Sequence, residues 1–386
     1  MKIKSKKIPL KEVATFLNGY AFKPSDWSKE GLPIIRIQNL TGTNKEFNYY
    51  NGDYNEKYII EDGDILISWS ASLGIFLWKN ITGILNQHIF KVIFDKDIET
   101  DKLYFLHCMK YLIKKIEKNI HGSTMKHITR PEFEKINFPI YDIDIQRKIA
   151  KKLVFISEII DNNKRILVKL MDLSKSLFTT MFGDPFSKVI NKEEEKFFLK
   201  DITIINPSKK EIEEIKSNLE ISFITMADIS EDGRINVDNI KKLEDVKNNF
   251  TFFKENDVLF AKITPCMENG KGGVAKSLKN NIGFGTTEIH VLRPISNITN
   301  SQWIYHLTKL PLFRKDAEIH MTGSAGRRRV PTTYLANFKI KVPPIELQNK
   351  FAERIEKIEK LKFEIEKSIE TAQNLYDSLI SKYFDN

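Results

Sequence analysis

The sequence predicts an α+β protein built from two similar globular domains, each mixing short strands with helices and each followed by one long helix. Three observations predict this architecture. The segment Gln-Arg-Lys-Ile-Ala at 146–150 is echoed by Gln-Asn-Lys-Phe-Ala at 348–352. Each copy opens a stretch whose apolar residues step by three and four. The strand-like segments before the two copies also occur in the same order. The chain is therefore interpreted as an internal duplication.

The duplication divides the chain into five segments. We expect a first globular domain at 1–145, a central helix at 146–182, a linker at 183–196, a second globular domain at 197–347 and a C-terminal helix at 348–386. The linker is predicted from Gly183-Asp184-Pro185 and the charged residues after them, because glycine and proline punctuate regular structure. The length of the chain agrees with two domains plus two helical rods.

Both globular domains are expected to contain matching strands and one matching helix. The predicted strands lie at 33–38 and 61–67 in the first domain and at 221–226 and 254–260 in the second. Three polar residues then lead into a further strand, Asn86, Gln87 and His88 in the first domain and Thr286, Thr287 and Glu288 in the second. A helix capped near Thr100 or Asp101 follows, and its counterpart begins near Asn300 or Ser301 and is interrupted at Pro311.

The two long helices carry an apolar seam with heptad spacing. The seam residues are Ile149, Leu153, Ile156, Ile160, Leu167, Leu170 and Leu177 in the first helix, and Phe351, Ile355, Ile358, Ile365, Ile369 and Leu379 in the second. A rod of roughly 48 Å from Ile149 to Met181 is too long to bury in one small domain, so we expect it to lie against its twin. Polar Asn163, Ser174 and Lys362 interrupt the seam; they either fix its register or lie at solvated points.

Charge and composition favour a polyanionic partner. The formal net charge is +10 and the isoelectric point is near 9.2, and clustered Lys and Arg gain free energy by displacing counterions from phosphates. Cys108 and Cys266 stand alone, so neither a disulfide framework nor a zinc site is indicated and a reducing cytoplasm is expected. No run approaches about 18 apolar residues, so the chain is expected to be neither exported nor membrane-spanning.

Four segments stand out beside the duplicated order. They are Pro343-Pro344-Ile345-Glu346-Leu347-Gln348, the weaker copy Tyr141-Asp142-Ile143-Asp144-Ile145-Gln146, the strand entry Asn86-Gln87-His88, and the opening Ile8-Pro9-Leu10-Lys11-Glu12-Val13 with Asn18-Gly19. Together these features resemble the specificity subunit of type I restriction-modification enzymes. The resemblance covers essentially the whole chain. The first copy has Tyr141-Asp142 in place of the proline pair, which concerns only the local turn.

The resemblance implies that each globular domain is a target-recognition domain reading one half of a split sequence in double-stranded DNA. It also implies that the two helices pair antiparallel as a spacer. A duplication about an antiparallel rod has a pseudo-two-fold axis, as duplex DNA does, so the two copies could face half-sites roughly 34 Å apart. The strand entries differ between the copies, which would let the halves read different bases.

The resemblance further implies partners and cofactors. Such subunits assemble with two adenine-N6 methyltransferase subunits and, where present, with restriction subunits; S-adenosylmethionine, ATP and Mg²⁺ belong to those partners and none to this chain. Two alternatives stay open. One is the recognition subunit of a related type II-like system that cuts beside its site, and the other is a coiled-coil adaptor without nucleic-acid partners.

The candidate DNA contacts lie on polar loops. Arg327, Arg328 and Arg329 follow Gly323 and Gly326; arginine can grip phosphates or guanine edges, and the alternative is a solvated charge run. The other candidates are Thr124, Lys126, His127 and Arg130 in the first domain, Lys262, Thr264 and Lys271 in the second, and the strand entries Asn86, Gln87, His88, Thr286 and Thr287. Asn86, Gln87 and His88 offer the donors and acceptors that adenine and guanine edges require, although strand capping explains them nearly as well.

Catalytic patterns are incomplete. The segment 270–277 approaches a phosphate-binding loop but has Ala275 where the second glycine belongs. Asn206-Pro207-Ser208 lacks the second proline and the aromatic ring of an amino-methyltransferase motif. His107, Cys108, His121 and His127 match no regular metal spacing. A stand-alone enzyme is therefore the least favoured interpretation.

Overall fold

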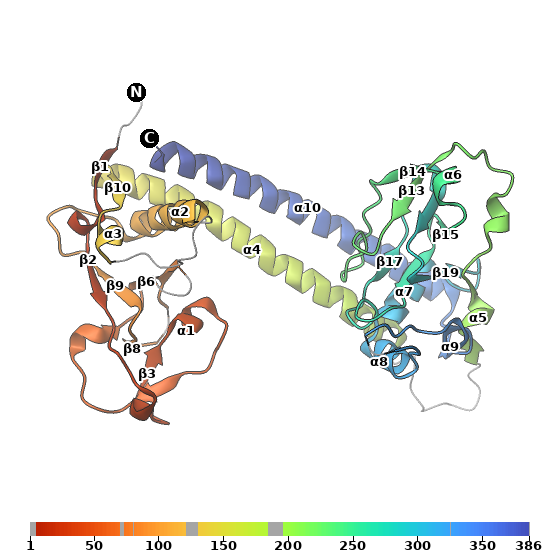
Figure 1. Ribbon diagram of the computed structural model, residues 1–386, viewed down its shortest axis with the longest axis horizontal. Helices are drawn as coiled ribbons and strands as arrows, with labels where there is room; N and C mark the ends of the chain where they lie inside the picture. Colours follow the sequence, from red (N-terminus) through yellow and green to blue (C-terminus); the bar gives the residue numbers. More distant parts are fainter. Residues whose placement is uncertain are drawn as a thin grey trace. The chain divides into compact units, whose positions relative to one another are not determined.

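The computed structural model describes residues 5–69, 73–79, 81–120, 130–183, 196–324 and 326–385 of the chain (Figure 1). The chain forms two compact units. Unit 1 comprises residues 1–165 together with 366–386, and unit 2 comprises residues 166–365. Both long helices are divided between the units, whereas the division expected from sequence separates the helices from the globular domains. Each unit therefore holds one globular domain and one part of each helix.

Unit 1 contains ten strands among its described residues, in three small sheets. The strands are β1 (Lys6–Pro9), β2 (Thr15–Asn18), β3 (Leu32–Ile35), β4 (Asn48–Tyr50), β5 (Ile59–Ile60), β6 (Ile65–Ser68), β7 (Gly74–Leu77), β8 (Gly83–Leu85), β9 (Ile89–Ile93) and β10 (Asn137–Ile140). Their sheet orders are β1-β10, β2-β9-β6-β7 and β4-β3-β8-β5, and only β3 and β8 pair in parallel. The helices are α1 (Ile37–Thr41), α2 (Lys102–Ile120), α3 (Arg130–Glu134) and the first part of α4 (Ile143–Phe182).

Unit 2 repeats this plan strand for strand. Its strands are β11 (Lys196–Phe198), β12 (Thr203–Ile205), β13 (Glu220–Ile224), β14 (Ile240–Lys242), β15 (Thr251–Lys254), β16 (Val258–Ala261), β17 (Gly272–Val274), β18 (Ile282–Gly285), β19 (Ile289–Pro294) and β20 (Lys339–Lys341). The orders β11-β20, β12-β19-β16-β17 and β14-β13-β18-β15 match unit 1, including one parallel pair, β13 with β18. The helices are the second part of α4, α5 (Leu199–Ile202), α6 (Leu243–Val246), α7 (Ser301–Lys309), α8 (Pro311–Ile319), α9 (Thr332–Ala336) and the first part of α10 (Ile345–Phe384), whose second part belongs to unit 1. The predicted α+β fold with duplicated domains is confirmed.

The duplication extends to single turns. Before β6 the chain turns at Gly63, and before β16 it turns at Asn256, and both residues have positive φ, at 86° and 68°. The following aspartate caps the turn in the same way, because the Asp64 carboxylate accepts from Glu61 N–H and the Asp257 carboxylate from Lys254 N–H, each at 2.8 Å. Gly and Asn tolerate left-handed backbone, which explains why they hold this position.

The predicted helix starts are also confirmed. Asp101 caps α2 by accepting from the N–H groups of Leu103 and Tyr104 at 3.0 and 2.8 Å. Asn300 caps α7 by accepting from Trp303 N–H at 2.9 Å. Pro311 cannot donate an interior helical hydrogen bond, so α7 ends at Lys309 and Pro311 begins α8.

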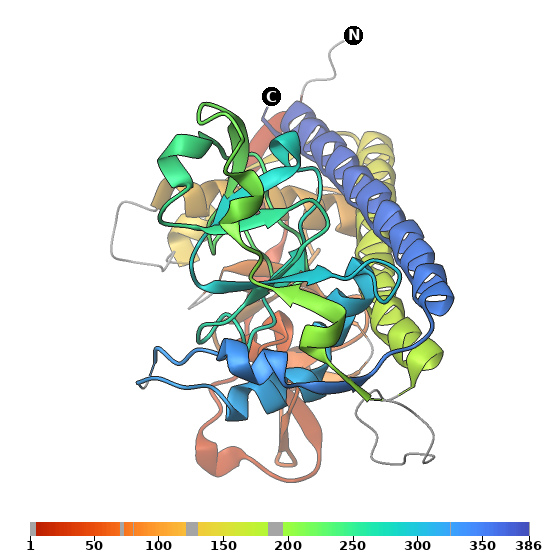
Figure 2. The same ribbon diagram turned by 90° about the vertical axis from the view of Figure 1, so that its right-hand side faces the viewer.

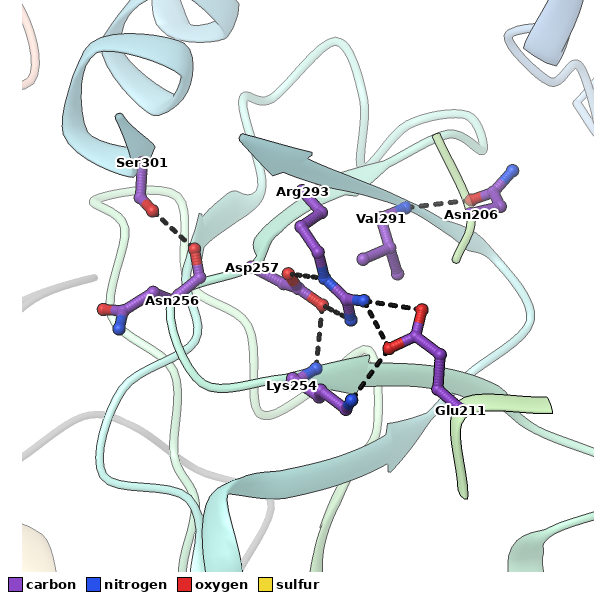
Figure 3. Close-up of polar contacts among 8 residues, drawn as sticks. All are labelled: Asn206, Glu211, Lys254, Asn256, Asp257, Val291, Arg293 and Ser301. Carbon is purple, nitrogen blue, oxygen red and sulfur yellow. Dashed lines mark hydrogen bonds and ion pairs between the residues drawn. The ribbon is translucent and has the colours of Figure 1, made fainter. Parts of the chain in front are cut away.

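An ion-pair network joins the two four-stranded sheets of unit 2 (Figure 3). The Arg293 guanidinium on β19 makes two hydrogen bonds of 2.7 Å to Asp257, which is almost fully buried. The same guanidinium reaches the Glu211 carboxylate at 2.7 and 2.8 Å, and Lys254 at the end of β15 pairs with that carboxylate at 2.8 Å. These hydrogen bonds, led by that from Lys254, hold the pKa of Glu211 below its usual value. Pairing makes the burial of Asp257 tolerable.

The long helices run antiparallel within each unit, as Figures 1 and 2 show. In unit 1, Ile149 and Leu153 near the start of α4 share a core with Ile380 and Phe384 near the end of α10. In unit 2, Phe178 near the end of α4 shares a core with residues near the start of α10. Asn163 donates to Ser368 Oγ at 3.0 Å between the helices, which favours the register interpretation for Asn163. None of the described helices is long and apolar enough to cross a bilayer.

The predicted seam is buried unevenly. Its buried members are Ile149, Leu153, Ile156, Ile160, Phe351, Ile355 and Ile358, and its half-buried members are Leu167, Leu170, Leu177, Ile365, Ile369 and Leu379. The start of each helix is covered by its own globular domain as well as by the other helix, whereas the middle is covered less. Ser174 is buried but donates only to Leu170 O at 3.1 Å within its own helix.

Candidate nucleic-acid interface

The strand entries singled out from the sequence occupy equivalent turns. In each unit the chain leaves one four-stranded sheet and enters the other there, from β8 to β9 in unit 1 and from β18 to β19 in unit 2. Asn86 N–H donates to Ile35 O at 3.1 Å, and Thr286 N–H donates to Ile224 O at 3.0 Å. Ile35 and Ile224 end the equivalent strands β3 and β13. The turns are therefore held in the same way although their side chains differ.

In unit 2, the loop that carries Arg327, Arg328 and Arg329, here named the arginine loop, packs beside this turn. Val330 N–H donates to Lys262 O at 2.9 Å, and Thr264 N–H donates to Arg328 O at 3.1 Å. Lys262 N–H donates to Glu288 O at 3.0 Å. The backbone of Lys262 thus lies between the turn and the arginine loop. The structure brings together Lys262, Thr264, Thr286, Arg328 and Arg329, which come from three separate segments of the sequence.

A buried histidine fixes this junction from below. His290 Nε2 donates to Val330 O at 2.8 Å, and its Nδ1 accepts from the Asn206 side-chain amide at 3.1 Å. Asn206 is held in turn by Val291 N–H, which donates to its side-chain oxygen at 3.0 Å (Figure 3). Burial lowers the pKa of His290 to about 4. The imidazole is therefore neutral at physiological pH, as this pair of hydrogen bonds requires.

Carboxylates offset much of the charge of the arginine loop. Arg329 makes two hydrogen bonds of 2.8 Å to Glu288, and Arg328 lies 3.6 Å from both Glu268 and Glu318. Arg327 is exposed, and its side chain has no ion-pair partner among the residues that the structure describes. The sequence alone suggested three equivalent cations. Within the described part of the chain, Arg328 and Arg329 are paired with carboxylates and Arg327 is not.

Neighbouring charges shift the titration of this cluster. The hydrogen bond from Arg329, more than any other factor, holds the pKa of Glu288 below its usual value. Burial lowers the pKa of Lys262, while the nearby Glu288 opposes that shift. Because the Glu288 carboxylate lies between the Lys262 and Arg329 side chains, the cluster alternates basic and acidic groups. Such alternation suits recognition of a base edge better than uniform attraction to phosphates.

Four further candidates of unit 2 differ in how their side chains are engaged. Lys271 donates to Met226 O at 3.0 Å, which anchors its loop beside the end of β13. Thr264 donates to Glu268 at 2.9 Å, so its hydroxyl is engaged within its own loop. Thr287 is exposed in the turn, while Thr286 Oγ1 accepts from Glu288 N–H at 3.2 Å. Thr286 therefore supports the turn that presents Glu288.

The turn of unit 1 exposes different chemistry. Gln87 and His88 are exposed, and His88 has positive φ at 71°. The His88 ring meets the Trp69 ring edge to face at 5.3 Å, and Trp69 N–H donates to His88 O at 3.3 Å. Trp69 and Lys262 therefore occupy equivalent places after β6 and β16. Trp69 is half-buried and stacks on Phe90 against the core of unit 1.

The remaining candidates of unit 1 are Thr124, Lys126, His127 and Arg130. Thr124, Lys126 and His127 lie outside the described residues. Arg130 begins α3 and pairs with Glu134 one turn later at 2.7 Å. This pair is a local helical contact, and no described contact links Arg130 to Asn86, Gln87 or His88.

The sequence did not single out Arg36, and it gave no sign of the role of Glu288. Arg36 directly follows β3, next to the Ile35 carbonyl that holds Asn86, and its guanidinium lies 5.3 Å from the centre of the Trp27 ring. Aligning the two copies would have found it, because Thr225 holds the equivalent place after β13. No pattern in the sequence indicated that Glu288 would pair with Arg329, 41 residues away.

A family model described as "Type I restriction modification DNA specificity domain" matches the chain twice, at residues 2–171 and 191–372. The chain belongs to the type I restriction-modification specificity subunits. The two matches correspond to the two copies of the duplicated fold. The predicted family is thereby confirmed.

Relatives agree with this assignment. The EcoBI specificity subunit of Escherichia coli is 23% identical over 98% of this chain and 85% of that protein. The EcoAI specificity subunit of the same organism is 38% identical over 51% of this chain. The matched segment spans 35% of the EcoAI subunit and 32% of the EcoEI subunit, so the chain covers about a third of those relatives.

Two solved structures share the fold of this specificity subunit. The S subunit of a type I restriction-modification system from M. genitalium aligns with 99% of this chain and 96% of its own, at 15% identity and a TM-score of 0.59. A chain from a study of complex assembly and conformational transition of the type I R-M system aligns at 14% identity and a TM-score of 0.56, covering 99% of this chain and 97% of its own. At these identities the likeness concerns the fold.

Proposed function

We propose that this specificity subunit reads a bipartite target in double-stranded DNA, with one half read by each globular domain. It contributes no catalytic chemistry. Its role is to place two adenine-N6 methyltransferase subunits, and restriction subunits where they exist, on that target. S-adenosylmethionine, ATP and Mg²⁺ then belong to the partners. Among the described residues of this chain, no three His, Cys, Asp or Glu side chains are grouped to hold a metal.

The observation that carries the proposal is one backbone frame bearing two different sets of side chains. The turns at 86–88 and 286–288 are held by equivalent hydrogen bonds. At equivalent positions unit 1 presents His88 beside Trp69, and unit 2 presents Glu288 beside Lys262. A frame that is kept while its exposed side chains change suits two readers of two different sequences. A purely structural duplication would not require different polar chemistry at this turn.

The charges support the same proposal. The chain carries a net charge of +10, and Arg327 is exposed next to the Arg329–Glu288 pair. A free cation of this kind suits a phosphate, which positions the protein on the duplex, while paired groups suit base edges. The antiparallel helices give each unit a related framework, in keeping with the approximate two-fold symmetry of a duplex.

The proposal is tested by selection from random-sequence duplex DNA. The subunit is purified with its methyltransferase partners, and bound duplexes are recovered at two fixed salt concentrations, because phosphate contacts make affinity depend on salt. We expect enrichment of two short specified blocks separated by an unspecified spacer of constant length. Recovery of unenriched DNA, or of one continuous block, would contradict the proposal. The second result would leave DNA binding intact but remove the bipartite reading.

A further inference from the structure

Arg329 and Glu288 form a pair that leaves one edge of the guanidinium open. Nε of Arg329 donates to one oxygen of Glu288 and Nη2 donates to the other, each at 2.8 Å. The third nitrogen, Nη1, has one partner among the described residues, Arg327 O, at the long distance of 3.4 Å. The side edge of the guanidinium is therefore occupied. The end edge, formed by Nη1 and the remaining hydrogen of Nη2, can still donate two parallel hydrogen bonds.

The backbone of both residues is fixed. Arg329 exchanges hydrogen bonds with Thr322, donating to its carbonyl at 2.8 Å and accepting from its N–H at 2.9 Å. Glu288 is held on one side by Thr286 Oγ1 and on the other by Lys262 N–H. Lys262 O also accepts from Val330 N–H. The backbone of Lys262 therefore links the segment that contains Glu288 to the segment that contains Arg329. The Arg329 side chain is thus fixed at its backbone by Thr322 and at its guanidinium by Glu288.

The Arg329–Glu288 pair lies at the surface, where each side chain restrains the other. The side chains of Arg329 and Glu288 are 45% and 27% exposed, so a ligand can reach the open edge. An arginine that contacts only phosphate binds it more strongly when no carboxylate is nearby. Arg329, in contrast, is hydrogen-bonded to the Glu288 carboxylate. A carboxylate weakens attraction to phosphate, but it fixes the plane of the fork, and plane and direction are what a base edge distinguishes.

Guanine is the base whose major-groove edge fits this open edge. It offers two acceptors, O6 and N7, side by side, whereas adenine offers one acceptor and one donor there. Resting on the proposed function, we propose that Glu288 is a positioning residue that holds Arg329 for a bidentate contact with one guanine in the half of the target read by unit 2. Glu288 itself acts through Arg329.

The test determines the enriched motif for the wild-type complex and for three variants in the same selection. Glu288→Gln removes the charge and one of the two oxygens, and Arg329→Lys keeps the charge but removes the planar fork. Glu318→Gln is the matched control, because it removes the same charge from a carboxylate 3.6 Å from Arg328 in the same cluster. Thermal unfolding of each variant shows that its fold is kept.

We expect Glu288→Gln and Arg329→Lys to lose preference for guanine at the same single position, roughly tenfold to a hundredfold. The other positions of that block and the whole of the other block keep their preferences, as does every position in Glu318→Gln. A purely structural role would lower binding to all sequences alike. Uniformly tighter binding by Glu288→Gln with an unchanged motif would mean that Glu288 only repels phosphate, and would overturn the inference.

The outcomes also separate this inference from the proposed function. A wild-type motif that survives unaltered in both folded variants overturns the inference and leaves bipartite reading in place. Loss of preference at a position that is not guanine overturns it as well. A wild-type complex that enriches no motif refutes the proposed function itself, and the inference falls with it.

Discussion

The side-chain oxygen of Gln146 accepts a hydrogen bond from the backbone N–H of Asp101 at 3.0 Å. Asp101 caps α2 and Gln146 lies in the first turn of α4, so the bond ties the beginnings of two helices together. Gln348 does the same in unit 2, accepting from Asn300 N–H at 3.2 Å where α7 begins. The glutamine of the duplicated segment is therefore a joint between each globular domain and its long helix.

Both glutamines are completely buried and use their amide nitrogen as well. Gln146 Nε2 donates to Glu99 O at 3.0 Å and to Tyr141 O at 2.7 Å. Gln348 Nε2 donates to Ile298 O at 3.0 Å and to Pro343 O at 2.8 Å. Each side chain thus satisfies three backbone groups at the joint.

Replacing either glutamine by alanine should therefore lower the free energy of unfolding by about 3 kcal/mol, because several buried backbone groups lose their partners at once. The measurement is denaturant unfolding of Gln146→Ala and of Gln348→Ala. Arg147→Ala is the control, since Arg147 is exposed beside Gln146 and should change stability by less than about 0.5 kcal/mol. Equal free energies of unfolding for all three variants would show that the buried glutamines do not contribute to stability.

Arg327 is expected to contact phosphate, because its side chain is exposed and has no carboxylate partner among the residues described, unlike Arg328 and Arg329. Arg327→Ala should weaken binding to all duplexes by a similar factor and reduce the slope of log affinity against log salt by about one. Binding is followed by fluorescence anisotropy across a salt titration. Lys339→Ala removes one charge from the separate sheet β11-β20 and should leave the slope unchanged. If the two variants behave alike, the arginine loop is not a phosphate contact.

Burial of neutral histidines should make stability depend on pH. Burial, helped by Lys110, lowers the pKa of His107 to about 4, and burial lowers that of His290 to about 4. In the unfolded chain histidine titrates near 6.5. The unfolded state therefore binds more protons between these values. The stability from each neutral histidine is present above about pH 6.5 and is lost as the pH falls toward 4, by about 1.4 kcal/mol per pH unit.

His107→Gln tests this expectation in unit 1. Glutamine can still meet the Tyr376 hydroxyl, which lies 2.7 Å from His107 Nδ1, but it does not titrate. Denaturant unfolding at pH 7.5, 6 and 5 should show a shallower loss of stability for the variant than for the wild-type chain. A wild-type stability that stays constant across this range would refute the argument.

The duplicated fold could be predicted from sequence because its signals are local or periodic. The heptad seam, the caps at Asp101 and Asn300, and the interruption at Pro311 each depend on a few neighbouring residues. The uneven burial of the seam could not be predicted. Whether Leu167 or Ile369 is covered depends on what the rest of the chain places over the helix, which a periodic pattern does not contain.

The candidate site was predicted only as separate pieces. The turns at 86–88 and 286–288 and the arginine loop were found from their polar residues, but their proximity depends on strand pairings between distant segments. The junction of Lys262 with Glu288 and Val330 is of this kind. The pairing of Arg328 and Arg329, but not Arg327, with carboxylates of the described residues depends on side-chain geometry that composition does not contain.

The continuous helices should set the spacing between the two halves of the target. α4 continues across the unit boundary at Arg165, and α10 continues across it at Ile365. Inserting one heptad into both helices at these points keeps the seam in phase and lengthens each by about 10 Å. The selected motif should keep both blocks and gain up to about three base pairs of spacer. Insertion into α4 alone is the control, because it misaligns the helices and should destabilise the protein. An unaltered spacer would contradict the expectation that the two helices set the spacing.

The central claim, that the two domains read two different halves of one split target, is tested most directly by mapping N6-methyladenine across the genome of the host before and after deletion of this gene. We predict that one motif with two unlike blocks and a spacer of constant length loses its methylation, and that it returns when the gene is restored. A methylation pattern that is identical with and without the gene, in a host whose partner methyltransferase is expressed, would contradict the account.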